Sequence, residues 1–175
     1  MKILMKSKKG FLLAEESLKI IIAVICLLFL SGFLLKIYSD SQDKKDLEFA
    51  KASIMKINED INKGLPDSEG IQNPQSGIGR FWFLSIWPYG DKKIIPKSCS
   101  NVGWNNCICI CEIWYLQGFT RQKLSDRCDV SGACLELKKD LAVSGSSGIV
   151  NDIIEMKNMP LDLQINYDSK KITRK

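Results

Sequence analysis

The distribution of hydrophobic and polar positions along this chain begins with one long apolar block near the N-terminus. Residues 20–35 carry no charge, and only Ser31 and Gly32 weakly interrupt the run. With its apolar flanks the block reaches about 20 residues, the length that a helix needs to cross a membrane. It lacks the polar stripe at helical spacing that a core helix of a soluble domain shows. The pattern therefore predicts a transmembrane helix over residues 11–38.

Beyond this block the pattern becomes amphipathic, with one apolar seam at alternating steps of three and four residues. The seam consists of Leu47, Ala50, Ile54, Ile57 and Ile61. It predicts a stalk helix over residues 39–63, ended by Gly64 and Pro66. The seam spans barely two heptads, so packing on the chain's own domain is favoured over a dimeric coiled coil. Residues 64–79 are rich in Gly, Pro, Asn, Asp and Ser and are expected to form a linker loop.

The remaining 80–175 segment has the patterns of a small β domain. Residues 80–88 are apolar on both faces, which predicts a central or covered strand. Further strands are expected at residues 106–116, 161–167 and 171–174. Other segments are assigned as a turn at 88–91, a flexible loop at 144–148, a short helix or strand at 149–157, and a turn at 168–170. The predicted fold class is α+β, a long N-terminal helix followed by a mostly antiparallel sheet.

Seven cysteines are present, and six of them follow the apolar block. The six are Cys99, Cys107, Cys109, Cys111, Cys128 and Cys134. Cys107, Cys109 and Cys111 alternate along one strand, so all three project from the same face. Same-face neighbours on a strand lie about 6.5–7 Å apart, at or beyond the usual limit for a disulfide. Each is therefore expected to pair with one of the other three, and 15 connectivities stay formally open.

Two alternatives to structural disulfides exist for these cysteines. A C-x-C-x-C face of reduced thiols suits a soft metal, whereas zinc sites favour C-x2-4-C knuckles or histidine, and the chain has no histidine. A redox-active pair is disfavoured because no C-x-x-C occurs. The seventh cysteine, Cys26, lies within the apolar block and is expected to be an inert small apolar residue. An even number of cysteines outside a membrane favours the disulfide framework.

The charge distribution sets the expected orientation. The N-terminal flank is basic, with lysines at positions 2, 6, 8 and 9 and no acid before Glu15. Cytoplasmic flanks carry such an excess, so we expect a single-pass protein of the cell membrane with its N-terminus inside and its C-terminal domain outside. From Lys36 onward there are 20 basic and 18 acidic residues, a balance that gives no sign of nucleic-acid binding.

The residues before the apolar block carry a more specific motif. The run from Lys8 to Glu15, KKGFLLAE, resembles the processing site of type IV pilins and pseudopilins, with Gly10 before the cut and Phe11 as first mature residue. The resemblance implies that residues 1–10 are a basic leader removed by a prepilin peptidase. It also implies that Glu15, at the fifth mature position, registers one like subunit against the next. The match covers under a fifth of the chain.

Two residues depart from the pilin pattern. Glu16 follows Glu15, and Lys19 occupies the ninth mature position, where pilins are apolar. Lys19 can pair with either glutamate at three- or four-residue spacing. The segment is most similar to the N-termini of archaeal pilin-like single-pass membrane proteins. The alternative is a plain, uncleaved signal-anchor.

Two functions are consistent with these patterns. The first is a pilin-like structural protein of the cell surface, a subunit of a type IV pilus-like filament. The second is a monomeric anchored module that binds a ligand or stabilises the envelope. We expect no enzyme, cofactor or metal site, because the chain lacks histidine and phosphate-binding loops. The aromatic residues Trp82, Trp87, Trp104, Trp114 and Tyr115 are expected to serve core packing rather than an adhesive surface.

Overall fold

A computed structural model describes residues 8–72, 74, 80–88, 94–114, 120–145, 152–156 and 160–175, with side chains from Glu16 onward. The chain divides into two compact units, Met1–Asp43 and Lys44–Lys175. Most of the predicted turn at 88–91 and most of the predicted loop at 144–148 lie outside the described residues.

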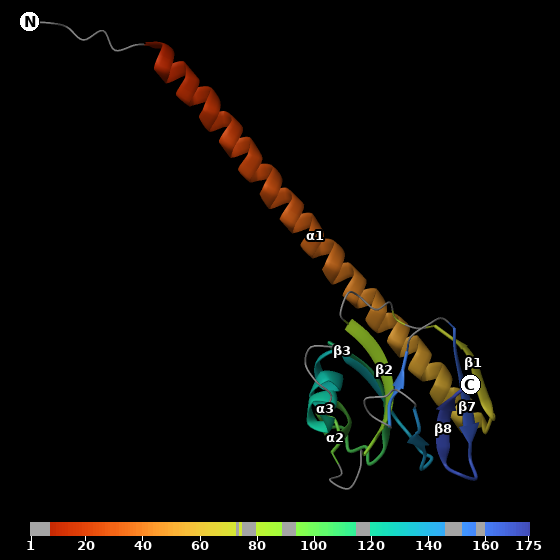
Figure 1. The fold of residues 1–175 in the computed structure, drawn as a ribbon. Helices are drawn as coiled ribbons and strands as arrows, with labels where there is room; N and C mark the ends of the chain where they lie inside the picture. The colour runs from red at the N-terminus through yellow and green to blue at the C-terminus, as the bar shows by residue number, and fades with distance from the viewer. Residues whose placement is uncertain are drawn as a thin grey trace, which may run out of the picture. The chain divides into compact units, whose positions relative to one another are not determined.

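The first unit contains the N-terminal part of helix α1, which runs from Lys8 to Lys63 (Figure 1). Large apolar side chains from Leu18 to Tyr38 are half or more exposed at most positions, and Phe29 reaches 79%. The stretch is long and apolar enough to cross a membrane, and none of it is buried within the protein. This exposure distinguishes it from the core helix of a soluble protein.

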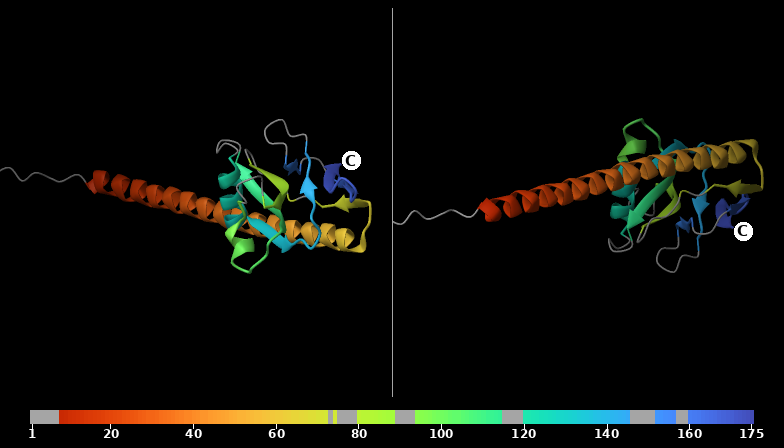
Figure 2. Two further views of the ribbon diagram at one scale, coloured as in Figure 1. Left: turned by 90° about the horizontal axis from the view of Figure 1, so that it is seen from below. Right: turned by 90° about the horizontal axis from the view of Figure 1, so that it is seen from above.

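The second unit contains the C-terminal part of α1, whose predicted seam is confirmed. Ala50, Ile54, Ile57 and Ile61 are at most 1% exposed, and Leu47 packs against them at the edge of the core. The alternative, a dimeric coiled coil, is not needed to bury these side chains. The seam is buried against the protein's own sheets. Figure 2 shows these sheets beside the yellow part of the helix.

Helix α1 ends where the sequence predicted, and the carbonyls of Asp60 and Ile61 in its last turn accept hydrogen bonds from the residues that follow. Gly64 adopts a φ of +75°, Gly64 N–H donates to Ile61 O, and Leu65 N–H donates to Asp60 O at 3.0 Å. These two bonds form a Schellman motif, which requires a residue in the left-handed region. The Tyr167 hydroxyl donates a further hydrogen bond to Leu65 O at 2.9 Å. Burial, with a smaller contribution from the Asp60 carboxylate, raises the pKa of Tyr167 above its ordinary value.

The strands of the second unit form two four-stranded sheets. In the first sheet the order is β1-β7-β8-β5, and in the second it is β4-β3-β2-β6. All pairings are antiparallel except that of β5 with β8. The strands are β1 Asp67–Ile71, β2 Arg80–Trp87, β3 Cys107–Trp114, β4 Gly132–Glu136, β5 Ala142–Val143, β6 Ile154–Glu155, β7 Leu161–Asn166 and β8 Lys171–Arg174.

The second sheet is covered on both faces, as the apolar pattern of residues 80–88 predicted. One face of β2 and β3 joins the core formed with α1 and the first sheet. The other face packs under two short helices, α2 (Lys97–Ser100) and α3 (Arg121–Val130). Trp82 and Trp87, at 2% and 0% exposed, belong to these two cores, whereas Trp114 is 39% exposed. The disulfide-stapled α+β fold is therefore confirmed.

One assignment from the sequence needs correction: the expected linker at residues 64–79 contains strand β1. The strand pairs with β7, and its register shifts between Ser68 and Ile71. Ser68 donates its hydroxyl to Asp60 at 2.6 Å, and Ile71 is fully buried. Polar composition concealed the strand because its pairing comes from tertiary contact rather than from residue preference.

Candidate functional site

The site that the domain builds most completely is a cluster of six cysteines on the outer face of the second sheet. Cys107, Cys109 and Cys111 alternate along β3, and their partners on β2 in the antiparallel register are Trp87, Ser85 and Phe83. The intervening isoleucines of β3 point to the opposite face and join the main core. Two-residue periodicity therefore places three sulfur atoms in one row.

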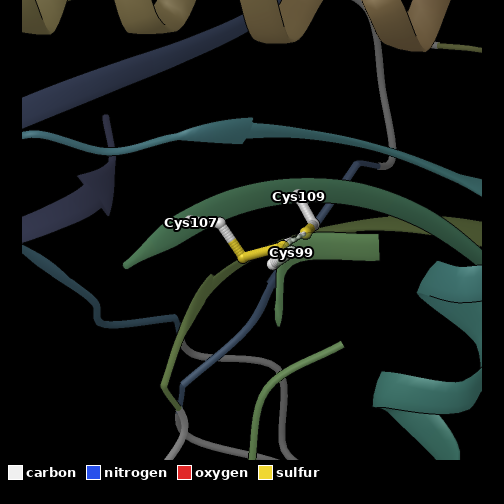
Figure 3. A group of neighbouring side chains, drawn as sticks. All are labelled: Cys99, Cys107 and Cys109. Carbon is white, nitrogen blue, oxygen red and sulfur yellow. Dashed lines mark hydrogen bonds between the residues drawn. A yellow bond between two sulfur atoms is a disulfide. The ribbon is translucent and has the colours of Figure 1, made fainter. Parts of the chain in front are cut away.

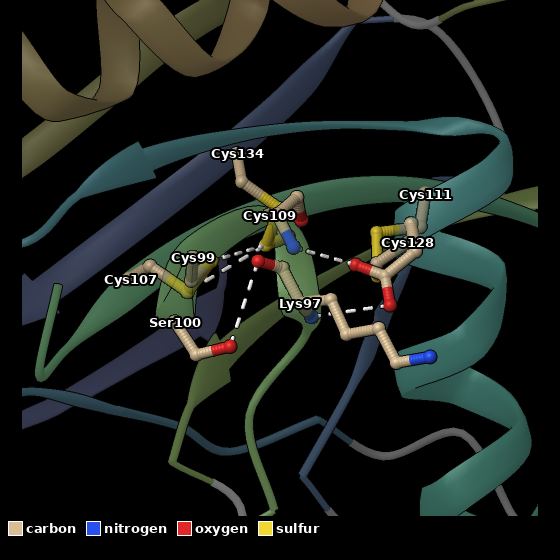
Figure 4. The surroundings of a disulfide bond; sticks show 10 residues. Lys97, Cys99, Ser100, Cys107, Cys109, Cys111, Cys128 and Cys134 are labelled. Atoms are coloured by element: carbon tan, nitrogen blue, oxygen red, sulfur yellow. Dashed lines mark hydrogen bonds between the residues drawn. A yellow bond between two sulfur atoms is a disulfide. The ribbon is translucent and has the colours of Figure 1, made fainter. Parts of the chain in front are cut away.

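Three other elements bring the second cysteine of each pair to this row (Figure 4). Cys99 comes from α2, Cys128 from α3 and Cys134 from β4. The resulting disulfides are Cys99–Cys107, Cys109–Cys134 and Cys111–Cys128, with sequence separations of 8, 25 and 17 residues. Every strand cysteine is bonded to one from another element, which is the pairing scheme that strand geometry predicted.

The three disulfides lie close together, and at one end of the row the sulfurs of two bridges are in contact. Cys109 Sγ lies 3.8 Å from Cys99 Sγ and 3.9 Å from Cys107 Sγ (Figure 3). At the other end, the sulfurs of Cys109, Cys111 and Cys128 all lie within 4.8 Å of one another. We call the six bonded cysteines the sulfur cluster. It forms a continuous apolar strip between the sheet and the two short helices.

Close packing buries the cluster except at Cys134, which is half-buried. Four of its cysteines are 0% exposed, and Leu124 of α3 is buried with them. Helix α3 packs closely against Gly132 at the start of β4. A Cβ at this position would lie 2.7 Å from Cys128 O and 2.9 Å from Cys111 Sγ, so no larger residue fits there without a shift. Ser85 is fully buried on the same face, and its hydroxyl has no hydrogen-bond partner among the residues that the structure describes.

Polar contacts fix the two helices that carry the outer cysteines. Thr120 caps α3 by accepting a hydrogen bond from Lys123 N–H at 3.3 Å. At the other end of α3, the Asp129 carboxylate accepts hydrogen bonds from the backbone N–H groups of Lys97 and Ser98, at 3.1 and 2.7 Å. Asp129 thereby links the start of α2 to α3 by charge-assisted hydrogen bonds. Both helices are therefore held by hydrogen bonds as well as by their disulfides.

The chemistry of the cluster is that of a structural staple. A sulfur in a disulfide is not a thiolate, and the thiolate is the form of cysteine that binds metals and acts as a nucleophile. Two groups of three sulfurs have a spacing that suits a soft metal, Cys99 with Cys107 and Cys109, and Cys109 with Cys111 and Cys128. Either group would become a ligand set only after its bridges are reduced. In the bonded form the arrangement joins α2, α3 and β4 to β3.

The other predicted site lies at the N-terminus of the first unit. Gly10, Phe11 and Glu15 belong to the backbone of α1, but their side chains lie outside the described ones. Glu16 and Lys19 are exposed on the same helix. The roles of Gly10 and Phe11 in processing, and of Glu15 in assembly, therefore stay predictions.

Together these observations define a disulfide-stapled α+β domain preceded by a long, exposed apolar helix. No protein-family model, curated protein or solved structure matches this chain.

The sequence reasoning missed α2, α3 and β4, the elements that close the cluster. A signal for α3 existed in Thr120 as an N-cap and in Leu124 and Cys128, which lie four residues apart on the buried face.

Proposed function

We propose that this chain is a pilin-like, membrane-anchored structural protein of the cell surface. In this account a prepilin peptidase cleaves after Gly10, the apolar part of α1 stays in the lipid bilayer, and the domain stands outside the cell. Like subunits then associate through their N-terminal helices, with Glu15 paired to the new N-terminus at Phe11. The protein becomes a subunit of a type IV pilus-like filament or of its base.

The observation that carries the proposal is the contrast along helix α1. Ile25 is 49% exposed in the apolar stretch, whereas Ile57 is fully buried in the seam of the domain. Exposed apolar side chains over a membrane-spanning length need lipid or other helices around them. The basic N-terminal flank supports a cytoplasmic N-terminus, and three disulfides suit an oxidising exterior.

The carboxylate at position 15 fits the assembly role on physical grounds. An ionised glutamate beside hydrocarbon is costly and seeks a cationic partner. Cleavage after Gly10 would create such a partner, the ammonium group of Phe11, in a neighbouring subunit. Lys19 offers a competing cation on the same helix, four residues beyond Glu15. The proposal therefore requires that the intermolecular pair form although an intramolecular one is available.

Processing and assembly are tested separately with two variants in cells that contain a prepilin peptidase. We expect Gly10→Val to abolish cleavage, because a β-branched side chain at the cut restricts the open backbone that a protease needs. We expect Glu15→Gln to be cleaved normally but to lose most of the surface material released by shearing. Immunoblots of membranes and sheared fractions measure both results.

Lys9→Ala serves as a matched control, because it changes the leader beside Gly10 without altering the cut itself. It should be processed like the parent. Equal processing of Gly10→Val and the parent would contradict the proposal at the cleavage step. Equal surface material from Glu15→Gln would contradict the assembly step.

A second candidate function is a monomeric anchored binding module, and a cavity in the outer domain favours it. The cavity has a volume of about 480 Å³ and lies beside the loop between Cys99 and Cys107. Chemical crosslinking in native membranes distinguishes the candidates, because a filament subunit gives a ladder of homo-oligomers and a monomeric module gives none.

A further inference from the structure

The loop closed by the Cys99–Cys107 disulfide lines one side of an open cavity, which belongs neither to the apolar helix nor to the sulfur cluster. Its volume of about 480 Å³ falls within the range of small-molecule sites. The lining residues that lie between the two cysteines are Ser100, Gly103, Trp104, Asn105 and Asn106. One short, crosslinked loop thus supplies most of the described wall.

This loop is held in one conformation by its own backbone. Trp104 N–H donates to Cys99 O at 3.2 Å, and Gly103 N–H donates to Ser100 O at 3.1 Å. Gly103 has a φ of +79°, in the left-handed region that other residues rarely adopt. A binding wall that is ordered before the ligand arrives avoids the entropy cost of ordering it on binding.

The described part of the wall is neutral and amphipathic. Trp104 is half-buried, packs against the core of the sulfur face, and also lines the cavity. Asn105 and Asn106 carry amide groups that both donate and accept hydrogen bonds, and Ser100 carries a hydroxyl. No lysine, arginine, aspartate or glutamate is among the described lining residues. The described lining residues therefore offer no charge-assisted contact to a phosphate, a carboxylate or a metal ion.

We propose that this cavity binds a neutral carbohydrate, with Trp104 as the stacking platform and the two asparagine amides as hydrogen-bond partners of sugar hydroxyls. A pyranose ring has one face of C–H groups and a rim of hydroxyls. The negative face of an indole attracts the C–H groups, and neutral amides match the hydroxyls as both donors and acceptors. The site goes beyond the proposed function and does not depend on leader cleavage or filament assembly.

The test is saturation-transfer-difference NMR on the full, unprocessed chain in lipid nanodiscs, which avoids sugar-based detergents. The probes are the methyl pyranosides of glucose, galactose, mannose and N-acetylglucosamine. We expect saturation of the C–H protons on one ring face of at least one probe. The affinity should fall about tenfold or more in Trp104→Ala and should be partly retained in Trp104→Phe.

Two further variants keep the result interpretable. Trp114→Ala removes an exposed tryptophan that does not line the cavity and should leave binding unchanged. Asn105→Ala alters an exposed side chain, so it should fold normally, with an unchanged near-UV circular dichroism spectrum, and bind several-fold more weakly. Absence of saturation transfer to all four probes overturns the proposal. So does binding that is unchanged in both Trp104→Ala and Asn105→Ala.

Discussion

The Cys109→Ala/Cys134→Ala double variant is expected to lose roughly 3.5 kcal/mol of unfolding free energy, because its bridge closes a loop of 25 residues. These two cysteines lie directly opposite each other on β3 and β4, at the centre of the sulfur cluster. Removing both leaves no cysteine of the cluster without its partner, so the other two bridges are retained. For a domain of this size the loss corresponds to a fall in melting temperature of about 10 °C or more.

Cys26→Ala provides the matched control for this variant. Cys26 is the free cysteine of the described chain and is exposed within the apolar stretch. Its replacement should leave the melting temperature unchanged when near-UV circular dichroism follows the domain in detergent. If the double variant had the same melting temperature as Cys26→Ala, the Cys109–Cys134 bridge of the sulfur cluster would not stabilise the fold.

Ile57→Ala is expected to destabilise the domain by about 3 kcal/mol, within the usual range for truncating a fully buried isoleucine. Ile57 belongs to the core shared by α1 and both sheets, so its removal leaves a cavity that three layers must close. The same thermal melt in detergent measures the loss.

Ile25→Ala makes the identical chemical change on the same helix, at a position that is 49% exposed in the apolar stretch. It should leave the melting temperature of the domain unchanged. If the two alanine variants were equally destabilised, the division of α1 into an exposed apolar part and a buried seam would be wrong.

The features that could be predicted from the sequence are those with a local periodic cause. The seam of Ala50, Ile54, Ile57 and Ile61 follows helical spacing, and the helix end follows from Gly64 and Pro66. Residues 80–88 are apolar at nearly every position, which required a strand covered on both faces. Cysteines that alternate along β3 required partners from elsewhere, because same-face neighbours on one strand are too far apart.

The features that could not be predicted depend on contacts between distant segments. Strand β1 has the composition of a loop and exists because β7 lies beside it. Helix α3 is mostly polar, and only Leu124, Ser125 and Cys128 are buried. Because neither α3 nor β4 was expected, the sequence could not choose among the possible disulfide connectivities. The cavity at Trp104 depends in the same way on a disulfide that the sequence did not specify.

The mass of the protein isolated from its own membranes tests the central proposal most directly. An unreduced sample analysed by intact-mass and N-terminal peptide spectrometry reports both the N-terminus and the oxidation state. The account predicts a chain that begins at Phe11 and is six hydrogens lighter than its fully reduced form. A mature chain that retains Met1, or any of residues 2–10, would contradict pilin-type processing.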